Sequence, residues 1–381
     1  MRHLASAISV SLLLCICAVS AQADMLLYAD FETDTGGFIS ADPTGELSVT
    51  HDPHLVFEGE GSLEFRYTQM PFQSDVPEWG LPGVLIIPVA GGAPDLSTIS
   101  FALRSRLSTP VVITLGLGDE GPRYNRFIWS TAESWSQFEL SLDEFIFDRD
   151  GPGDPEAPLE PGQITSIAVI DAHGFVRMIA EEEPLVHVDP PVQQTLWLDS
   201  FALSTRASAP VPELQQAHLL ADYASPMRGF LPVGGTDLHI ESERRPDGEY
   251  GLRVDYTTPA RTLFGVLHHV PHGALADATS LRFNARTNRP LTLVVFLEEK
   301  RGPGELDKSR YESVVRLEPG EDLREITLPL ALFELGEDQT DPDGALNLRL
   351  VEMLSIVDVT AAFEDTEVIN TLHLSPPEVI R

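Results

Sequence analysis

The chain has 381 residues, with 59 Asp and Glu against 25 Lys and Arg, and its formal net charge at pH 7 is −34. A surface this acidic repels phosphate backbones and anionic headgroups, which makes nucleic acids and membranes poor hypotheses as partners. Both cysteines, Cys15 and Cys17, lie in the first 23 residues, so the rest of the chain can form no disulfide or thiolate metal site. Most of the excess carboxylate keeps an exported protein soluble, although it also suits calcium.

Residues 1–23 have the pattern of a secretory signal peptide. Arg2 precedes an apolar run from Leu4 to Ala18, and the small residues up to Ala23 are typical of a cleavage site. Polar sequence follows, so a retained membrane anchor is the less favoured interpretation. The sequence predicts a secreted or periplasmic protein that starts at Asp24, with no membrane insertion after cleavage.

The remaining sequence contains one pattern twice. "LLYADFETDTGGF" at 26–38 corresponds to "HLLADYASPMRGF" at 218–230, and "WSQFELSLDEF" from 135 corresponds to "LREITLPLALF" from 323. The offset drifts from 192 (Phe31 over Tyr223) to 176 (Gln194 over Asn370), as expected for duplicated domains whose strands persist while loops change length. We predict a first domain at 24–206 (copy one), an Ala- and Pro-rich linker at 207–216, and a second domain at 217–381 (copy two).

Both copies show the periodicity of β-strands. "SLEFRYT" at 62–68, "FELSL" at 138–142 and "LRVDY" at 252–256 alternate apolar with polar residues. "PVVITLGLG" at 110–118 and "PLTLVVFLEE" at 290–299 are apolar runs typical of strands buried on both faces. No window shows helical periodicity over three turns. The sequence therefore predicts an all-β fold of two tandem antiparallel β-sandwiches, each with about eight strands.

Four motifs of copy one have a recognisable order: an opening "DFE" followed by Gly-Phe, then "EGEGSLEFRY", a late Trp before "FELSLDEF", and a closing "LWLDSFAL". This pattern resembles the galactose-binding-like jelly rolls, which include many carbohydrate-binding modules. Within them it is most similar to the subgroup seen in the complex I intermediate-associated protein. The resemblance covers nearly the whole mature chain, once per copy, and implies two jelly-roll sandwiches. The superfamily hosts unrelated functions, so the fold alone does not name a ligand.

The resemblance also implies a calcium ion, which in such modules commonly ties the first strand to the last through one acid in each. The matching residues in copy one are Asp30 or Glu32 near the start and Asp199 near the end, and carboxylates are suitable calcium ligands. In copy two, Ala224 and Ser375 replace two of these three acids. We expect calcium in copy one only. The alternative is that these acids are strand-end carboxylates that face water.

Sugar-binding sandwiches stack sugar rings on exposed aromatic side chains, aided by planar polar groups. Trp79 lies in a loop flanked by Pro and Gly, and "RYNRFIW" at 123–129 supplies Tyr124, Arg126 and Trp129. We take these four as candidate ligand-binding residues. For any single ring, core packing is the more common explanation.

Other conspicuous side chains are interpreted as structural. Trp135 matches a tryptophan that packs at the edge of such sandwiches, whereas Trp197 is ambiguous. Copy two has no tryptophan, and its basic stretch at 298–313 is interpreted as a solvated loop rather than a second binding surface. In "LHHVPHG", His268 and His269 are adjacent in a strand and point to opposite faces, which is poor geometry for a metal site.

The sequence contains no nucleophile elbow, no paired-carboxylate strand and no His-Glu-x-x-His motif, which argues against an enzyme. It predicts an exported, non-catalytic protein that binds a polysaccharide or other glycan. The alternative is a structural or assembly protein that uses its sandwiches to contact protein partners. Exposure of Trp79, Tyr124 and Trp129 along one groove favours the first function, and a flat apolar patch on copy two favours the second.

Overall fold

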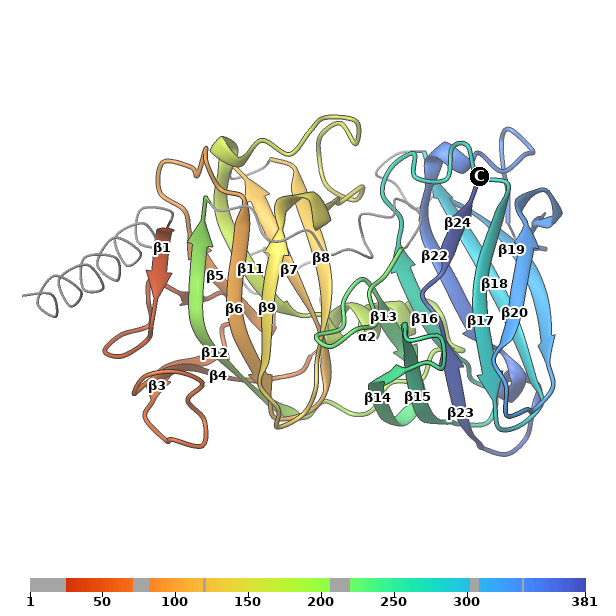
Figure 1. Ribbon diagram of the computed structural model, residues 1–381, viewed down its shortest axis with the longest axis horizontal. Coiled ribbons are helices and arrows are strands. Elements are labelled where there is room, and N and C mark those ends of the chain that lie inside the picture. The colour runs from red at the N-terminus through yellow and green to blue at the C-terminus, as the bar shows by residue number, and fades with distance from the viewer. Residues whose placement is uncertain (1–24, 71–81, 119–120, 206–219, 302–307, 338) are drawn as a thin grey trace, which may run out of the picture.

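The structure is a computed structural model that describes residues 25–70, 82–118, 121–205, 220–301, 308–337 and 339–381. Two β-sandwiches lie next to each other along the longest axis of the molecule (Figure 1). All pairings between the named strands are antiparallel, so the predicted fold class is confirmed. The predicted signal peptide (1–23) and linker (207–216) lie outside the described residues.

Each sheet of copy one has six strands. The first, here called the solvent sheet, has the order β3-β4-β12-β6-β9, with β1 also paired to β12. Its strands are β1 (Met25–Ala29), β3 (Glu46–Thr50), β4 (Ser62–Thr68), β6 (Thr98–Ser105), β9 (Ser136–Ser141) and β12 (Gln193–Ser204). The second, the junction sheet, has the order β10-β8-β7-β11-β5-β2. Its strands are β2 (Ile39–Ser40), β5 (Val84–Pro88), β7 (Thr109–Leu117), β8 (Arg123–Ser130), β10 (Ile146–Phe147) and β11 (Ile164–Asp171).

Copy two repeats both sheets. Its solvent sheet has the order β14-β15-β23-β17-β20 with β24 paired to β17, and its junction sheet has the order β13-β16-β22-β18-β19-β21. The solvent-sheet strands are β14 (Thr236–Arg244), β15 (Tyr250–Thr258), β17 (Ser280–Thr287), β20 (Arg324–Pro329), β23 (Val368–Leu374) and β24 (Glu378–Ile380). The junction-sheet strands are β13 (Leu231–Gly234), β16 (Phe264–His269), β18 (Leu291–Lys300), β19 (Lys308–Leu317), β21 (Glu334–Leu335) and β22 (Val351–Asp358). The shared strand order identifies the two halves as copies of one sandwich.

One α-helix, α2 (His173–Glu182), follows β11 and was not expected from the sequence. Its ten residues make less than three turns, so their periodicity is too short to predict a helix. Short 3-10 turns complete the structure: η2 (Leu142–Glu144), η3 (Pro161–Gln163), η5 (Leu330–Leu332), η6 (Leu348–Leu350) and η7 (Thr360–Phe363). Among the described residues, no helix is long and apolar enough to span a membrane.

Alternating burial along the strands forms a core inside each sandwich. In β4, Leu63, Phe65 and Tyr67 are at most 2% exposed, whereas the side chain of Arg66 is 57% exposed. Burying each such apolar side chain contributes about 1.5–3 kcal/mol. A buried tyrosine–aspartate hydrogen bond recurs in both cores: Tyr67 Oη donates to Asp171 Oδ2 (2.5 Å) in copy one, and its counterpart Tyr256 donates to an aspartate in copy two. Burial raises the pKa of both tyrosines, so they remain protonated donors.

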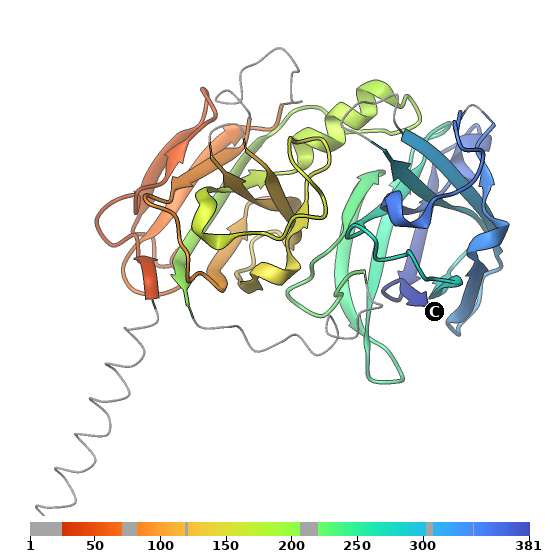
Figure 2. The same ribbon diagram turned by 90° about the horizontal axis from the view of Figure 1, so that it is seen from above.

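The two sandwiches share a third apolar cluster, which combines residues of both junction sheets with Val176 of α2. Figure 2 shows α2 at the boundary between the two sandwiches. Its buried members are Ala41, Val84, Val112, Ile170, Ala172, Val176 and Val186 from copy one, and Leu231 and Val233 from copy two. Because these side chains cover one another, the sandwiches pack as one unit rather than as two independent modules.

The first described segment of copy two, residues 220–230, pairs with the edge of copy one. Gly229 N donates to Phe127 O (2.9 Å), and Trp129 N donates to Met227 O (3.0 Å). The Trp129 ring extends into the core cluster of copy two, where it stacks on Phe230 with ring centres 6.2 Å apart. Residues of β8 therefore belong structurally to both copies.

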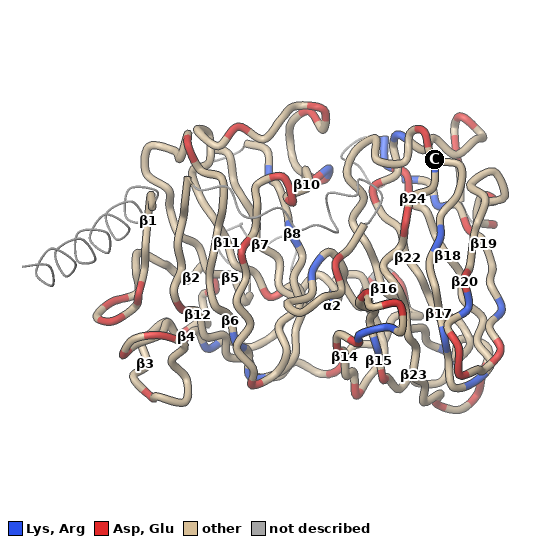
Figure 3. The backbone as a smooth tube through the Cα atoms, viewed as in Figure 1, with Lys and Arg blue, Asp and Glu red and all other residues tan. Residues whose placement is uncertain are grey.

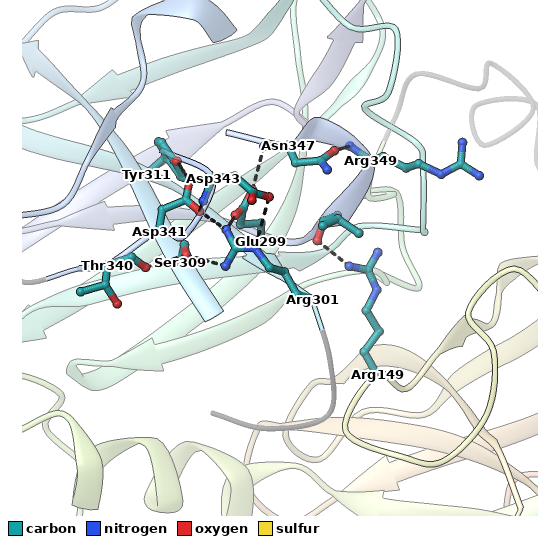
Figure 4. A network of polar contacts seen from close by, with 11 residues as sticks. Arg149, Glu299, Arg301, Ser309, Tyr311, Thr340, Asp341, Asp343, Asn347 and Arg349 are labelled. Carbon is teal, nitrogen blue, oxygen red and sulfur yellow. Dashed lines mark hydrogen bonds and ion pairs between the residues drawn. The ribbon is translucent and has the colours of Figure 1, made fainter. Parts of the chain in front are cut away.

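Polar contacts also join the copies. Arg149 of copy one donates to the carbonyl oxygens of Leu350 (2.6 Å) and Val351 (3.1 Å) in copy two. The side chain of Lys300 is fully buried and pairs with Asp150 of copy one. Figure 4 shows Arg149 reaching from its loop towards the polar network of copy two.

In that network, Arg301 lies between the buried carboxylates of Glu299 and Asp341, and Tyr311 also donates to Asp341 (Figure 4). The interpretation of residues 298–313 as a solvated loop is thus wrong for both ends of the stretch. Lys300 and Tyr311 are 2% and 4% exposed; Lys300 pairs with Asp150 of copy one, and Tyr311 donates to the buried Asp341. Residues 302–307 lie outside the described part of the chain.

Candidate ligand-binding surface

The structure places the predicted sugar-stacking residues of β8 in the interior. Tyr124 is 5% exposed and packs edge-on against Phe147, while Trp129 is 2% exposed in the core of copy two. A ring without an exposed face cannot stack on a sugar, so β8 does not provide the platform expected from the sequence. Trp129 is buried by copy two, whereas Tyr124 is buried in the core of copy one. Trp79 lies outside the described residues.

Arg126, the fourth predicted residue, is also buried. It lies 3.3 Å from Glu144, which pairs at 3.0 Å with Arg228 of copy two. Burial lowers the pKa of Arg126, and the Glu144 carboxylate opposes that shift. Arg126 therefore supports the contact between the copies and is not available to a ligand.

The three predicted calcium ligands accept hydrogen bonds from nearby backbone amides. Asp199 is 1% exposed, and its Oδ2 accepts from the amides of Phe57 (2.8 Å) and Glu58 (3.2 Å). Both carboxylate oxygens of Glu32 accept from the amide of Glu60 (2.8 and 3.0 Å). Burial raises the pKa of Asp199, and these hydrogen bonds oppose the rise.

Asp30 Oδ1 accepts from the amide of Glu32 (3.2 Å). No group of three or more His, Cys, Asp or Glu side chains that could hold a metal ion is found in the described part of the chain. The arrangement gives Asp199 and Glu32 a role that needs no ion, which is to hold the loop at residues 57–60 against the ends of the sheet. Calcium binding stays a prediction.

Replacing Asp199 with alanine separates these two roles. The substitution removes the acceptor of the partly buried hydrogen bonds from the Phe57 and Glu58 amides, so we expect the free energy of unfolding to fall by about 1–3 kcal/mol in chelator as well as in calcium. Urea denaturation of both proteins in each buffer measures this. A loss that appears only when calcium is supplied contradicts the hydrogen-bond role and supports the ion.

The outer face of the solvent sheet of copy one carries a cross-strand row that the sequence did not single out. Trp197 and Glu64 of this row are only 8% and 6% exposed, so its accessible members are Arg104, Trp135 and Phe57. Trp197 of β12 lies directly between Glu64 of β4 and Arg104 of β6 in the strand register. Trp197 Nε1 donates to Glu64 Oε1 (3.2 Å), and the guanidinium of Arg104 lies 5.6 Å from the centre of the Trp197 ring. Cross-strand partners share one face, and here the face points to solvent because the neighbouring residues of each strand form the core.

The row continues past Arg104. Leu103 pairs with Ser136 at the start of β9, so Trp135, one residue earlier, comes next to Arg104. The Trp135 ring lies 5.7 Å from the ring of Phe57, which is 39% exposed. We call Glu64, Trp197, Arg104, Trp135 and Phe57 the tryptophan row.

Polar atoms of the row are held in place. Arg104 Nη1 donates to the carbonyl of His54 (3.0 Å), and Glu64 pairs with Arg66 (2.7 Å). Arg104 Nε and Trp135 Nε1 are buried and have no acceptor among the described residues. The row thus combines two accessible rings, Trp135 and Phe57, with a fixed guanidinium and the buried Trp197 ring beneath it.

The sequence contained a signal for this row. Trp197 stands between Leu196 and Leu198, and Arg104 follows Leu103, so strand alternation places both polar-tipped residues on the outer face. The tryptophans were instead interpreted one by one, as structural or ambiguous, and their shared face was not recognised.

Copy two has different side chains at the same positions. His373 of β23 lies between Arg253 of β15 and Arg286 of β17, and Leu323 comes next to Arg286 where copy one has Trp135. Only the central arginine is common to both rows. Copy two therefore keeps the geometry of the row without its aromatic rings.

No family model and no curated protein matches the chain. The similar solved structures include the family 11 carbohydrate-binding module of the cellulase Lic26A-Cel5E of Clostridium thermocellum, with 14% identity, 42% of this chain and 92% of that chain covered, and a TM-score of 0.34. They also include the tandem CBM22-1–CBM22-2 domains of Paenibacillus barcinonensis Xyn10C (11% identity, 93% and 97% covered, TM-score 0.28). A third is the endo-β-1,4-glucuronan lyase of Trichoderma reesei (12% identity, 48% and 96% covered, TM-score 0.30). Similarities of this size concern the β-sandwich fold and identify neither a ligand nor an activity for this chain.

Proposed function

We propose that the chain is a non-catalytic carbohydrate-binding protein and that the tryptophan row takes the sugar. The observation that supports this most directly is the placement of Arg104, Trp135 and Phe57 side by side on the outer face of copy one, with Arg104 over the buried Trp197 ring. Aromatic rings offer the apolar surface on which a sugar ring stacks, and planar polar groups beside them bond its hydroxyls. The guanidinium of Arg104 is placed for the second task.

The chemistry of the row favours binding over hydrolysis. Glycoside hydrolysis generally uses two carboxyl groups that flank the scissile bond. The row contains one carboxylate, Glu64, and that group is occupied by Trp197 Nε1 and Arg66. A ligand would therefore be held on the row and released unchanged.

Replacing Trp135 or Phe57 with alanine tests the proposal. Each ring contributes about 0.5–1.5 kcal/mol of stacking beyond its buried area, so each substitution should weaken glycan binding by up to about tenfold and the pair by more. We would screen residues 24–381 on a glycan array and titrate the retained glycan into each variant. The control is Phe363→Ala, which removes an exposed phenylalanine of copy two, 76% exposed and outside the row.

Unchanged affinity in the double variant, with folding confirmed by circular dichroism, contradicts the assignment of the row. An equal loss in the Phe363 variant does so as well, because it points to a general effect of exposed rings. The proposal includes export to a secreted or periplasmic location, which rests on the signal pattern at 1–23.

One observation favours the alternative function, assembly with a protein partner. The four most exposed large apolar side chains of the described residues all belong to copy two: Phe363 (76%), Leu332 (66%), Ile369 (66%) and Val314 (59%). Exposed apolar surface of this kind suits protein contacts. If the folded protein binds no glycan on a broad array, this alternative is favoured. The next experiment is then affinity capture of protein partners, with Phe363→Asp as the control that should lose them.

A further inference from the structure

The solvent sheet of copy two borders a pocket of about 260 Å³, at one end of the row of Arg253, His373 and Arg286. Arg286 and His373 line it together with Glu243, Arg244 and Arg245. Binding sites for whole drug-sized ligands span about 300–1,000 Å³, so this pocket suits a single charged unit of a larger ligand. It is separate from the tryptophan row, which lies on copy one.

The one carboxylate of the lining is already engaged. Glu243 Oε2 lies 2.6 Å from Nδ1 of His373, whose Nε2 lies 2.9 Å from Nη2 of Arg286. Burial lowers the pKa of His373, and a neutral imidazole that donates from Nδ1 and accepts at Nε2 satisfies both neighbours. Arg286 Nη2 also lies 3.0 Å from Nδ1 of His373 and 3.9 Å from Glu243 Oε2, so the three side chains form one cluster at the pocket.

The guanidinium groups are only partly neutralised. Arg245 is paired with Asp247 (2.6 Å) and Glu249 (3.4 Å). Arg244 bonds the carbonyl of Gly248 (3.4 Å) and has no ion pair among the described residues. Arg286 donates to a backbone carbonyl (2.9 Å) and reaches Glu243 only at 3.9 Å. The positive charges of Arg244 and Arg286 are therefore not fully neutralised by nearby carboxylates, and several of their N–H donors remain available to a ligand.

This concentration of base is unusual for the chain. Residues 220–381 contain 16 of its 25 Lys and Arg, residues 24–205 contain 7, and the other two are Arg2 and Arg206. Figure 3 shows the basic segments gathered in copy two. At physiological ionic strength, charges beyond about 8 Å are largely screened, so the arginines at the pocket outweigh the distant carboxylates of copy one.

We propose that this pocket binds an anionic saccharide unit, with Arg244 and Arg286 as the groups that hold its acid. The planar guanidinium presents parallel N–H donors that match the two oxygens of a carboxylate or sulfate. A neutral sugar offers no such partner. The inference goes beyond glycan binding by the tryptophan row, because it concerns a second site with a different ligand chemistry.

Titration calorimetry with oligogalacturonate tests the proposal, and its fully methyl-esterified form is the matched neutral probe. A sulfated oligosaccharide in a third arm separates sulfate from carboxylate as the preferred acid. We expect binding of at least one acidic probe, little binding of the ester, and a loss of about tenfold or more in Arg286→Gln and in Arg244→Gln. Arg286→Lys keeps the charge without the planar fork, so its affinity should lie between those of the wild type and Arg286→Gln. This variant tests the proposal even where Arg286→Gln does not fold.

The control is Arg316→Gln, which removes an exposed positive charge of copy two outside the pocket. Equal binding of acid and ester overturns the proposal, as does an equal loss in the Arg316 variant or silence with both acidic probes. Trp135→Ala should leave this binding unchanged, and Arg286→Gln should leave glycan binding at the tryptophan row unchanged. The failure of one site is therefore distinguishable from the failure of the other.

Discussion

Replacing Trp129 with alanine lowers the free energy of unfolding by about 3–5 kcal/mol, the range for large buried side chains. The loss falls on copy two, although the residue belongs to copy one, because the ring packs on Phe230 in the copy-two core. The wild-type protein should unfold in one urea transition, and the variant in two, with copy two first. Intrinsic fluorescence and far-UV circular dichroism follow the two transitions.

Two substitutions serve as controls. Trp129→Phe keeps much of the buried ring and should cost less than half as much. Trp135→Ala removes a partly exposed tryptophan of the same copy and should leave a single transition. A single transition in Trp129→Ala, with a loss no greater than that of Trp135→Ala, would show that the ring does not couple the copies.

Glu352→Gln should make the protein more stable above pH 7. Burial raises the pKa of Glu352 from its ordinary value near 4.5 to about 7. The charged groups that face it are Lys300, Glu298, Lys308 and Asp150. Between pH 4.5 and 7 the folded state keeps a proton on Glu352 that the unfolded state has released, so the contribution of Glu352 to stability falls as the pH rises through this window. A shift of this size corresponds to about 3 kcal/mol, which the neutral glutamine should recover at pH 8 relative to pH 5.

The buried histidines produce the opposite slope. Burial lowers the pKa of His268 and His269 to about 4, so stability rises between pH 4 and the ordinary value near 6.5. Between pH 4.5 and 6.5 the two histidines outweigh the one glutamate, so the wild-type stability should rise to about pH 6.5 and fall slightly up to pH 7. The stability of the Glu352→Gln variant should rise more steeply and show no fall. Denaturation from pH 4 to 9 measures both limbs, with exposed Glu364→Gln as the control. A parallel profile in wild type and Glu352→Gln would show that Glu352 titrates normally.

The strands and the duplication were predictable from the sequence because each depends on local alternation. The run predicted at 62–68 coincides with β4, and those at 110–118 and 290–299 fall on β7 and β18. The alternation of apolar and polar residues along the strands is kept in both copies, although the loops between the strands differ in length. The contact between the copies was not predictable, because two kinds of residue look alike in the sequence. A residue buried in the core of its own sandwich and a residue buried against the other sandwich are both apolar.

Register was predicted less well than strand position. The similar stretches "PGVLII" from 82 and "FGVLHH" from 264 align His268 with Ile86, yet His268 is fully buried and bonds Tyr223 Oη (2.7 Å) inside the core. Its neighbour His269 faces Phe127 of copy one, so the prediction that the two histidines point to opposite faces is confirmed. The core position of copy one is Ile87, one residue later. A slip of one residue reverses every side chain of a strand, and sequence similarity at this level does not exclude it.

The candidate surface was missed for a related reason. Trp197, Arg104 and Trp135 are 31 or more residues apart in the chain, and only the pairing of β12, β6 and β9 brings them together. The sequence pattern instead favoured aromatic residues that are close in sequence, such as Tyr124 and Trp129, and both are buried. Long-range strand pairing is the information that one sequence does not supply.

The pairing of Met227 to Gly229 with β8 has a consequence for aggregation. An edge strand with open N–H and C=O groups is a template onto which strands of other molecules can add. In the intact chain, copy two occupies the part of the β8 edge beyond its short pairing with β10 and covers the apolar side chains next to it. Copy two thus protects copy one from aggregation. A chain that loses copy two exposes both an unpaired strand edge and an apolar surface.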